Sequence, residues 1–231
     1  MLEFLSTPAG RAVLGVFIAV VVLALLDLNY RFFAKALLDF LFALTVVIIL
    51  SPLLVTLAVI SRVKAGKTFE TAPYLGVKCK IIYLHTFAGI NGRLKYFAEI
   101  FDVLGGKMSF IGVKPLEIAD GALMDDKYME RFTARPGIIC HMLAGGYDGA
   151  SYEDMFALDA RYAKRRELFT DIFIFIKWLV LLARGEDKSY LGEAEAASYT
   201  KTLLERGAIT QSGFEQAQKF AADTLSKNAG R

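Results

Sequence analysis

The sequence predicts a mostly helical α/β protein that is associated with a membrane, and three observations predict this class. Hydrophobic residues make up 55% of the 231-residue chain and the mean hydropathy is +0.43, whereas a typical soluble domain is roughly 45–50% apolar. Two long apolar stretches stand in the first quarter of the chain. Strand-like and helix-like patterns follow them over the length of one ordinary domain.

The first apolar stretch, Ala12 to Leu28, predicts an N-terminal transmembrane anchor. It is about 17 residues long, which is just enough to cross a bilayer as a helix, and Tyr30 suits the membrane interface. A cleaved signal peptide is the alternative, but the residues from Asp27 to Tyr30 offer no small-residue cleavage site. We therefore expect an uncleaved anchor over residues 1–30.

The second stretch, Phe32 to Ile60, predicts a membrane helix that is broken at Ser51 and Pro52. Proline removes one backbone hydrogen bond and kinks a helix, and the Ser51 hydroxyl is a candidate partner for the freed carbonyl. Such a helix either spans the bilayer or turns back to the same face. Basic residues flank both ends, which favours two cytosolic ends: Arg31, Lys35, Arg62, Lys64 and Lys67. We expect a re-entrant helix over residues 31–62.

Residues 63–185 have the pattern of a compact mixed domain. The segment from Lys78 to Leu84 is typical of a short strand, and Leu94 to Leu104 has the apolar spacing of an amphipathic helix. Ser151 to Arg166 also favours a helix. The apolar segment from Asp171 to Ala183 is too short to span a bilayer, at about 13 residues, so we expect an interfacial helix.

Residues 186–231 predict a C-terminal helical hairpin. Gly207 suits the end of the first helix, and Thr210 suits the N-cap of the second. A hairpin of this size buries little area alone, so we expect it to pack on something else. Its sequence weakly resembles the short C-terminal hairpins of the SHOCT type.

Charge and cysteine content exclude some classes. The net charge is +3 and no long run of one sign occurs, which argues against nucleic acid as a partner and suits an anionic membrane surface better. Cys79 and Cys140 stand far apart, so we expect buried thiols in a reducing cytosol. His85 and His141 are equally isolated in sequence, and no metal site is expected.

Several phrases, taken together, resemble the bacterial sugar transferase family, the monotopic polyprenyl-phosphate phosphoglycosyl transferases. The resemblance covers about residues 32–185. The phrases, in chain order, are Ala36-Leu37-Leu38-Asp39 before the Ser51-Pro52 break, Phe69 with Gly76, Phe101 to Leu116 (FDVLGGKMSFIGVKPL), Arg135-Pro136-Gly137-Ile138, and Tyr162 with Asp171.

The resemblance implies a re-entrant helix hinged at Ser-Pro and a domain on the cytosolic face of the bacterial inner membrane. It also implies transfer of a sugar-1-phosphate from a nucleotide sugar to a polyprenyl phosphate. An Asp-Glu pair would supply the nucleophile, with assistance from Mg²⁺, because a carboxylate can attack phosphorus and a divalent cation offsets the diphosphate charge.

This sequence departs from the family at that pair, because Lys95 and Tyr96 stand at the two acidic positions. Neither side chain can serve as a carboxylate nucleophile or as a hard oxygen ligand for Mg²⁺. The family's "GPRP" arginine corresponds to Lys114, which keeps the charge but not the bidentate fork. Lys114 and Arg135 remain candidates for binding a lipid phosphate or head group.

One carboxylate near the lost pair needs a separate interpretation. Glu99 follows Lys95 by four residues, so we expect a surface ion pair between them, and a relocated nucleophile is the alternative. We expect His85 and His141 to be packed or surface residues rather than bases.

We therefore predict a non-catalytic member of the family that serves as a structural or regulatory subunit of a membrane complex. Its partners would be membrane lipid, including polyprenyl phosphate, and another protein. No cofactor is expected. The first alternative is an active transferase in exopolysaccharide or lipopolysaccharide assembly, which would need Mg²⁺. The second is a polyprenyl-phosphate-binding module without chemistry.

Overall fold

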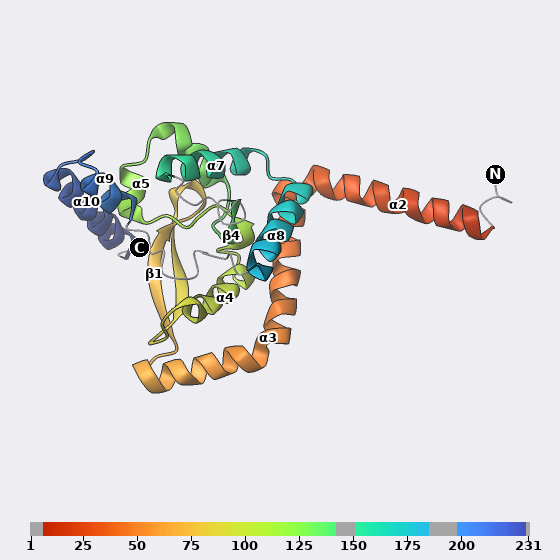
Figure 1. The fold of residues 1–231 in the computed structure, drawn as a ribbon, viewed down its shortest axis with the longest axis horizontal. Coiled ribbons are helices and arrows are strands. Elements are labelled where there is room, and N and C mark those ends of the chain that lie inside the picture. Colours follow the sequence, from red (N-terminus) through yellow and green to blue (C-terminus); the bar gives the residue numbers. More distant parts are fainter. Residues whose placement is uncertain (1–6, 142–150, 185–197, 230–231) are drawn as a thin grey trace.

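The computed structural model describes residues 7–141, 151–184 and 198–229. It shows a mostly helical α/β body with one long bent helix along its side (Figure 1). The predicted boundary between the domain and the C-terminal hairpin, at residues 185 and 186, lies outside the described residues. The division into four segments stays a prediction.

The chain begins with helix α2 (Pro8–Asn29), which projects away from the body in Figure 1. A short π-helix, η1 (Tyr30–Ala34), joins it to α3 (Lys35–Ala65). Within the described residues, α3 alone is long and apolar enough to cross a membrane, with a mean hydropathy of 2.7 over its most apolar window. Arg11–Val22 of α2 is a shorter apolar stretch. These features are compatible with membrane anchoring.

Helix α3 bends sharply about halfway along its length, as Figure 1 shows, and Pro52 lies inside it. Because proline has no N–H, the carbonyl of Ile48 loses its helical partner. The Ser51 hydroxyl donates to that carbonyl at 2.9 Å. The structure has the bend and the Ser51 hydrogen bond that the sequence predicts, and a hinge at Ser51 and Pro52 in a membrane stays a prediction.

The body contains two small sheets. Strands β1 (Phe69–Leu75) and β2 (Ile81–Phe87) pair antiparallel, with Phe69 opposite Phe87. Strands β3 (Ser109–Gly112) and β4 (Gly137–Cys140) pair parallel, with Ser109 opposite Gly137. The backbones of Gly112 and Gly137 come so close that a Cβ on Gly137 would lie 2.1 Å from the Gly112 nitrogen. This contact is the physical reason for a glycine at each position.

The strand expected at Lys78 to Leu84 begins three residues later than expected. Lys78 and Cys79 have positive φ angles of 56° and form a turn, η2 (Val77–Cys79), that links β1 to β2. Strand β1 was not anticipated, because Pro73 lies within it. A proline is tolerated there because, in the described part of the chain, β1 pairs along one side only, apart from an isolated bridge at Leu75.

Short helical segments complete the body. The amphipathic helix expected at Leu94 to Leu104 consists of a 3₁₀ segment and an α-helix. The segments are η3 (Arg93–Ala98), α4 (Glu99–Leu104), α5 (Ile118–Ala122), η4 (Asp126–Thr133), α7 (Tyr152–Lys164) and α8 (Leu168–Ala183). Helix α8 starts earlier than expected and exposes large apolar side chains such as Phe169 and Phe173.

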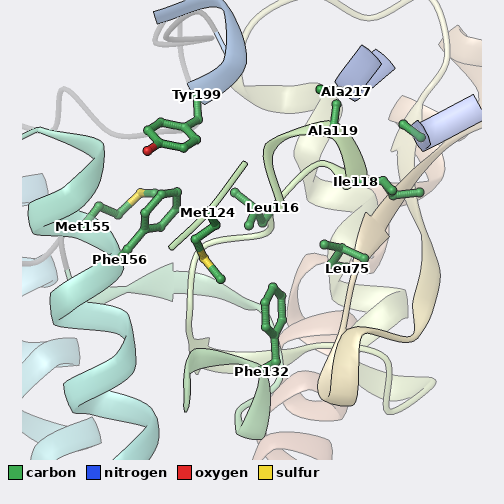
Figure 2. Packing of buried hydrophobic residues seen from close by; sticks show 11 residues of the cluster. Leu75, Leu116, Ile118, Ala119, Met124, Phe132, Met155, Phe156, Tyr199 and Ala217 are labelled. Atoms are coloured by element: carbon green, nitrogen blue, oxygen red, sulfur yellow. The ribbon is translucent and has the colours of Figure 1, made fainter. Parts of the chain in front are cut away.

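The C-terminal hairpin consists of α9 (Tyr199–Glu205) and α10 (Gln211–Ala229). Gly207 has a φ of 69°, and the Thr210 hydroxyl accepts a hydrogen bond from the Gly213 N–H at 3.2 Å, as the sequence predicts. Figure 2 shows its residues Tyr199 and Ala217 in one core with residues of β1, α5 and α7. The hairpin therefore packs on the body, as expected.

Candidate functional site

The positions predicted to hold the acidic pair lie in η3. Lys95 and Tyr96 are both half-buried, and the Lys95 ammonium stands 4.7 Å from the centre of the Tyr96 ring. This is the geometry of a cation–π contact. The position thus presents an ammonium group and a phenol in place of two carboxylates.

Glu99 does not lie on the surface, so the expected surface ion pair with Lys95 is wrong. Its side chain is on the buried face of α4, where the residue is only 5% exposed, and its Oε2 has no hydrogen-bond partner. Burial, with the nearby charge of Asp102, raises the pKa of Glu99 to about 8. The carboxyl therefore holds its proton at neutral pH and is a poor nucleophile.

Asp102 binds donors from β2 and from the loop that follows α4. Its Oδ1 is 2.7 Å from His85 Nδ1 and 3.2 Å from Lys107 Nζ, and its Oδ2 accepts from the His85 backbone N–H at 2.7 Å. Asp102 is 1% exposed. These contacts commit its carboxylate to holding β2 against α4. Sequence reasoning missed this cluster, because His85 and Asp102 are 17 residues apart.

Lys114 and Arg135 lie on neighbouring segments. The Val113 N–H donates to the Arg135 carbonyl at 3.2 Å, and the Gly137 N–H donates to the Val113 carbonyl at 2.9 Å. The Lys114 ammonium stands 5.3 Å from the centre of the Tyr152 ring. The structure therefore brings the two candidate phosphate-binding segments together. A phosphate-binding role for the two residues stays a prediction.

A buried ion pair fixes the segment that contains Lys114. Arg131 donates to Asp159 Oδ2 at 2.8 Å, and each side chain is 1% exposed. Arg131 also donates to the Lys114 carbonyl at 2.7 Å, and the Lys114 N–H donates to Asp159 at 3.1 Å. The carboxylate of Asp159 is thus buried and paired with Arg131 through Oδ2, whereas its Oδ1 has no hydrogen-bond partner. Sequence reasoning missed this pair, whose members are 28 residues apart.

A second polar cluster joins the membrane helix to the body. Asp171 of α8 accepts hydrogen bonds from Tyr30, from Lys35 and, at 2.7 Å, from Tyr162. Lys35 Nζ also stands 3.8 Å from Asp39 Oδ2, and Asp39 Oδ1 accepts from the Phe110 N–H at 3.0 Å. Residues from η1, α3, α7, α8 and β3 meet here. Asp39, Tyr162 and Asp171 carried part of the family resemblance, and the structure brings them together.

The described part of the structure contains two cavities away from the predicted site residues. One, of about 660 Å³, is lined by Lys127, Glu130, Ala160, Arg161, Lys164 and Arg165. The other, of about 210 Å³, lies beside the cluster around Asp171. Neither is lined by Lys95, Tyr96, Lys114 or Arg135. Within residues 7–141, 151–184 and 198–229, no group of three or more His, Cys, Asp or Glu side chains is arranged to hold a metal ion.

These observations define a membrane-associated α/β protein whose apolar helices are tied to a small mixed domain. Residues 90–185 match the family described as bacterial sugar transferase, and this match supports membership of that family. The family is linked to membranes and to polyprenyl phosphate substrates.

The chain is also similar to the exopolysaccharide production protein ExoY of Rhizobium meliloti (strain 1021). The two are 28% identical over 89 residues, which cover 38% of this chain and 39% of ExoY. The match therefore spans about two fifths of the relative's length.

Proposed function

We propose that this chain is a non-catalytic, membrane-docked member of the bacterial sugar transferase family, and that it serves as a structural or regulatory subunit of a membrane complex. The observation that carries the proposal is the pair Lys95 and Tyr96 at the acidic positions. The similarity to ExoY favours a complex that assembles an exopolysaccharide.

The surrounding carboxylates support this proposal. A relocated nucleophile would have to be ionised and accessible to a nucleotide sugar. Glu99 is buried and holds its proton, and Asp102 is buried and bound to His85 and Lys107. Asp159, which contacts the Lys114 backbone, is paired with Arg131. None of these three carboxylates meets both conditions.

The proposal includes a re-entrant α3 with both ends on the cytosolic face of the inner membrane. A straight helix of 31 residues would be about 46 Å long, but α3 bends, and both of its arms contact the same body. Asp39 in the first arm binds the Phe110 N–H. Leu57 in the second arm packs in a core that includes Leu84. Two arms that contact one small domain favour two ends on the domain's side of the bilayer.

This topology can be tested with single cysteines at Phe33 and Val63, which are exposed near the two ends of α3. Cys79 and Cys140 would first be replaced by serine. We expect both new thiols to react with a membrane-impermeant maleimide applied to the cytosolic face. Reaction of one thiol from each face would instead show a spanning helix.

The subunit role predicts a stable protein partner. The full chain would be purified in mild detergent from its native membrane, and the associated proteins would be quantified by mass spectrometry. We expect one partner in a fixed ratio to the chain. A chain that is recovered alone in native-like lipid would contradict the subunit role.

A further inference from the structure

The cavity of about 210 Å³ opens on the apolar side of the protein. It is lined by Tyr30, Leu38, Asp39, Phe42, Phe110, Ile111, Leu168, Asp171, Ile172 and Phe175. Leu38, Phe42 and Ile172 are exposed, whereas Tyr30, Asp39 and Asp171 are buried. The cavity therefore has an apolar rim on α3 and α8 and a polar floor. At about 30 Å³ per water molecule, it has room for about seven waters or a small head group.

One oxygen on this floor lacks a partner. Asp39 is 8% exposed, and its Oδ2 has no hydrogen-bond partner, although Oδ1 accepts from the Phe110 N–H. Lys35 Nζ stands 3.8 Å from Oδ2, which is beyond hydrogen-bond distance, and Lys35 is bound to Asp171. The Ser109 hydroxyl also lies close to the Asp39 carboxyl group. Buried polar atoms in native proteins are nearly always paired, so this one points to a ligand.

The charges on the floor indicate what kind of ligand fits. Among the described side chains on the floor, Asp39 and Asp171 contribute two carboxyl groups and Lys35 contributes one ammonium group, so acidic groups outnumber basic ones. A cation that donates a hydrogen bond would satisfy both the charge and the free oxygen. An anionic head group would instead meet Asp39 and be repelled.

We propose that this cavity binds the primary ammonium head group of a phospholipid, with its N–H donating to Asp39 Oδ2 and its glycerol and first acyl carbons against Phe42, Ile172 and Phe175. The inference rests on the proposed docking of α3 and α8 in the membrane. It adds a lipid site that is distinct from Lys114 and Arg135. Head-group selection here would hold the first arm of α3 and α8 at the depth of the lipid ammonium groups.

The test uses the full chain in nanodiscs with matched acyl chains. The discs would contain phosphatidylcholine mixed equally with phosphatidylethanolamine or with phosphatidylglycerol, and the lipids retained after release from the disc would be counted by native mass spectrometry. Phosphatidylcholine is the matched lipid, because its quaternary ammonium has the same charge but no N–H to donate. We expect at least about fivefold enrichment of phosphatidylethanolamine over phosphatidylcholine, and no enrichment of phosphatidylglycerol.

Two variants place the effect in the cavity. Asp39→Asn keeps an oxygen that can accept from Phe110 but replaces Oδ2 with an N–H donor, so we expect it to lose the enrichment. Ile172→Trp fills the rim while leaving Asp39 in place, and we expect the same loss. Asp125→Asn, at an exposed carboxylate outside the cavity, should keep the wild-type enrichment.

Equal retention of the two zwitterionic lipids, a preference for phosphatidylglycerol, or full enrichment in Asp39→Asn would overturn the proposal. These outcomes are distinct from failure of membrane docking, because cysteine labelling at Phe33 and Val63 reports docking separately. A chain that docks as proposed but shows no lipid preference would refute the ammonium site alone.

Discussion

Two polar regions of the body differ in which residues of the family pattern they keep. Around Asp171, tyrosine and lysine side chains donate hydrogen bonds to its carboxylate, and these bonds link α3 to α7 and α8. Around Lys95 and Tyr96, the positions of the family's acidic pair hold a cation and an aromatic ring. The first region fastens membrane helices to the domain, and the second is where transfer chemistry would occur. This difference supports the proposal that the chain keeps membrane docking without the acidic centre.

The same contrast appears in the carboxylates themselves. Asp171 satisfies three donors, whereas Glu99, on the same helix as Asp102, is buried with an oxygen that has no partner. A buried network is stable only when its members are paired. We therefore expect mutations in the two regions to act in opposite directions on stability.

The largest expected effect comes from Asp171→Ala. It would leave the buried Lys35 ammonium without its main counter-charge and should lower the free energy of unfolding by about 3–5 kcal/mol. Denaturant unfolding of the full chain in detergent would measure it. Asp125→Asn, which removes an exposed ion pair with Lys127 but keeps an oxygen for the Lys127 N–H, is the control and should change stability far less. Equal effects of the two substitutions would contradict a stabilising role for the network.

Glu99→Gln should instead raise the free energy of unfolding. The pKa of Glu99 is about 8 in the folded state, against 4.5 for the free side chain. Between these values the unfolded chain releases a proton that the folded chain keeps, so wild-type stability should fall as pH rises from about 4.5 to 8. Glutamine cannot ionise, so the variant should be more stable at pH 8 by about 2–4 kcal/mol. Identical pH profiles for the wild type and the variant would rule out this role for Glu99.

Ser51→Ala should have the smallest effect on stability. It removes the hydrogen bond to the Ile48 carbonyl, which Pro52 leaves free, at a cost of about 0.5–1.5 kcal/mol. Hydrogen exchange of the amides around the bend would report it. Thr45→Ala, which removes a similar bond to the Leu41 carbonyl away from the bend, is the matched control. We expect the amide hydrogens around the bend to exchange faster in Ser51→Ala than in the control.

Local features of the fold could be predicted from the sequence, because their causes lie within a few residues. The bend at Pro52, the cap at Thr210 and the glycine at Gly207 depend on backbone chemistry next to the residue concerned. Strand β1 was missed because Pro73 argues against a strand, and only its place at an edge makes it acceptable.

The candidate site could be predicted only in part. Lys95 and Tyr96 were located by counting along the chain from a family phrase. The partners of Asp102 and Asp159 could not be found in this way, because those ion pairs join elements that are distant in sequence. Burial of Glu99 also depends on which face of α4 packs against the core. Helical spacing alone does not settle that.

The central claim is that the docking scaffold is kept while transfer chemistry is absent. The direct test incubates the purified full chain in nanodiscs with polyprenyl phosphate, Mg²⁺ and a panel of nucleotide sugars, with an active family member as positive control. We predict that no sugar-1-phosphate reaches the lipid above the background of protein-free discs. Magnesium-dependent transfer by the wild type, abolished by substitution of a single carboxylate such as Asp102→Asn, would contradict the account.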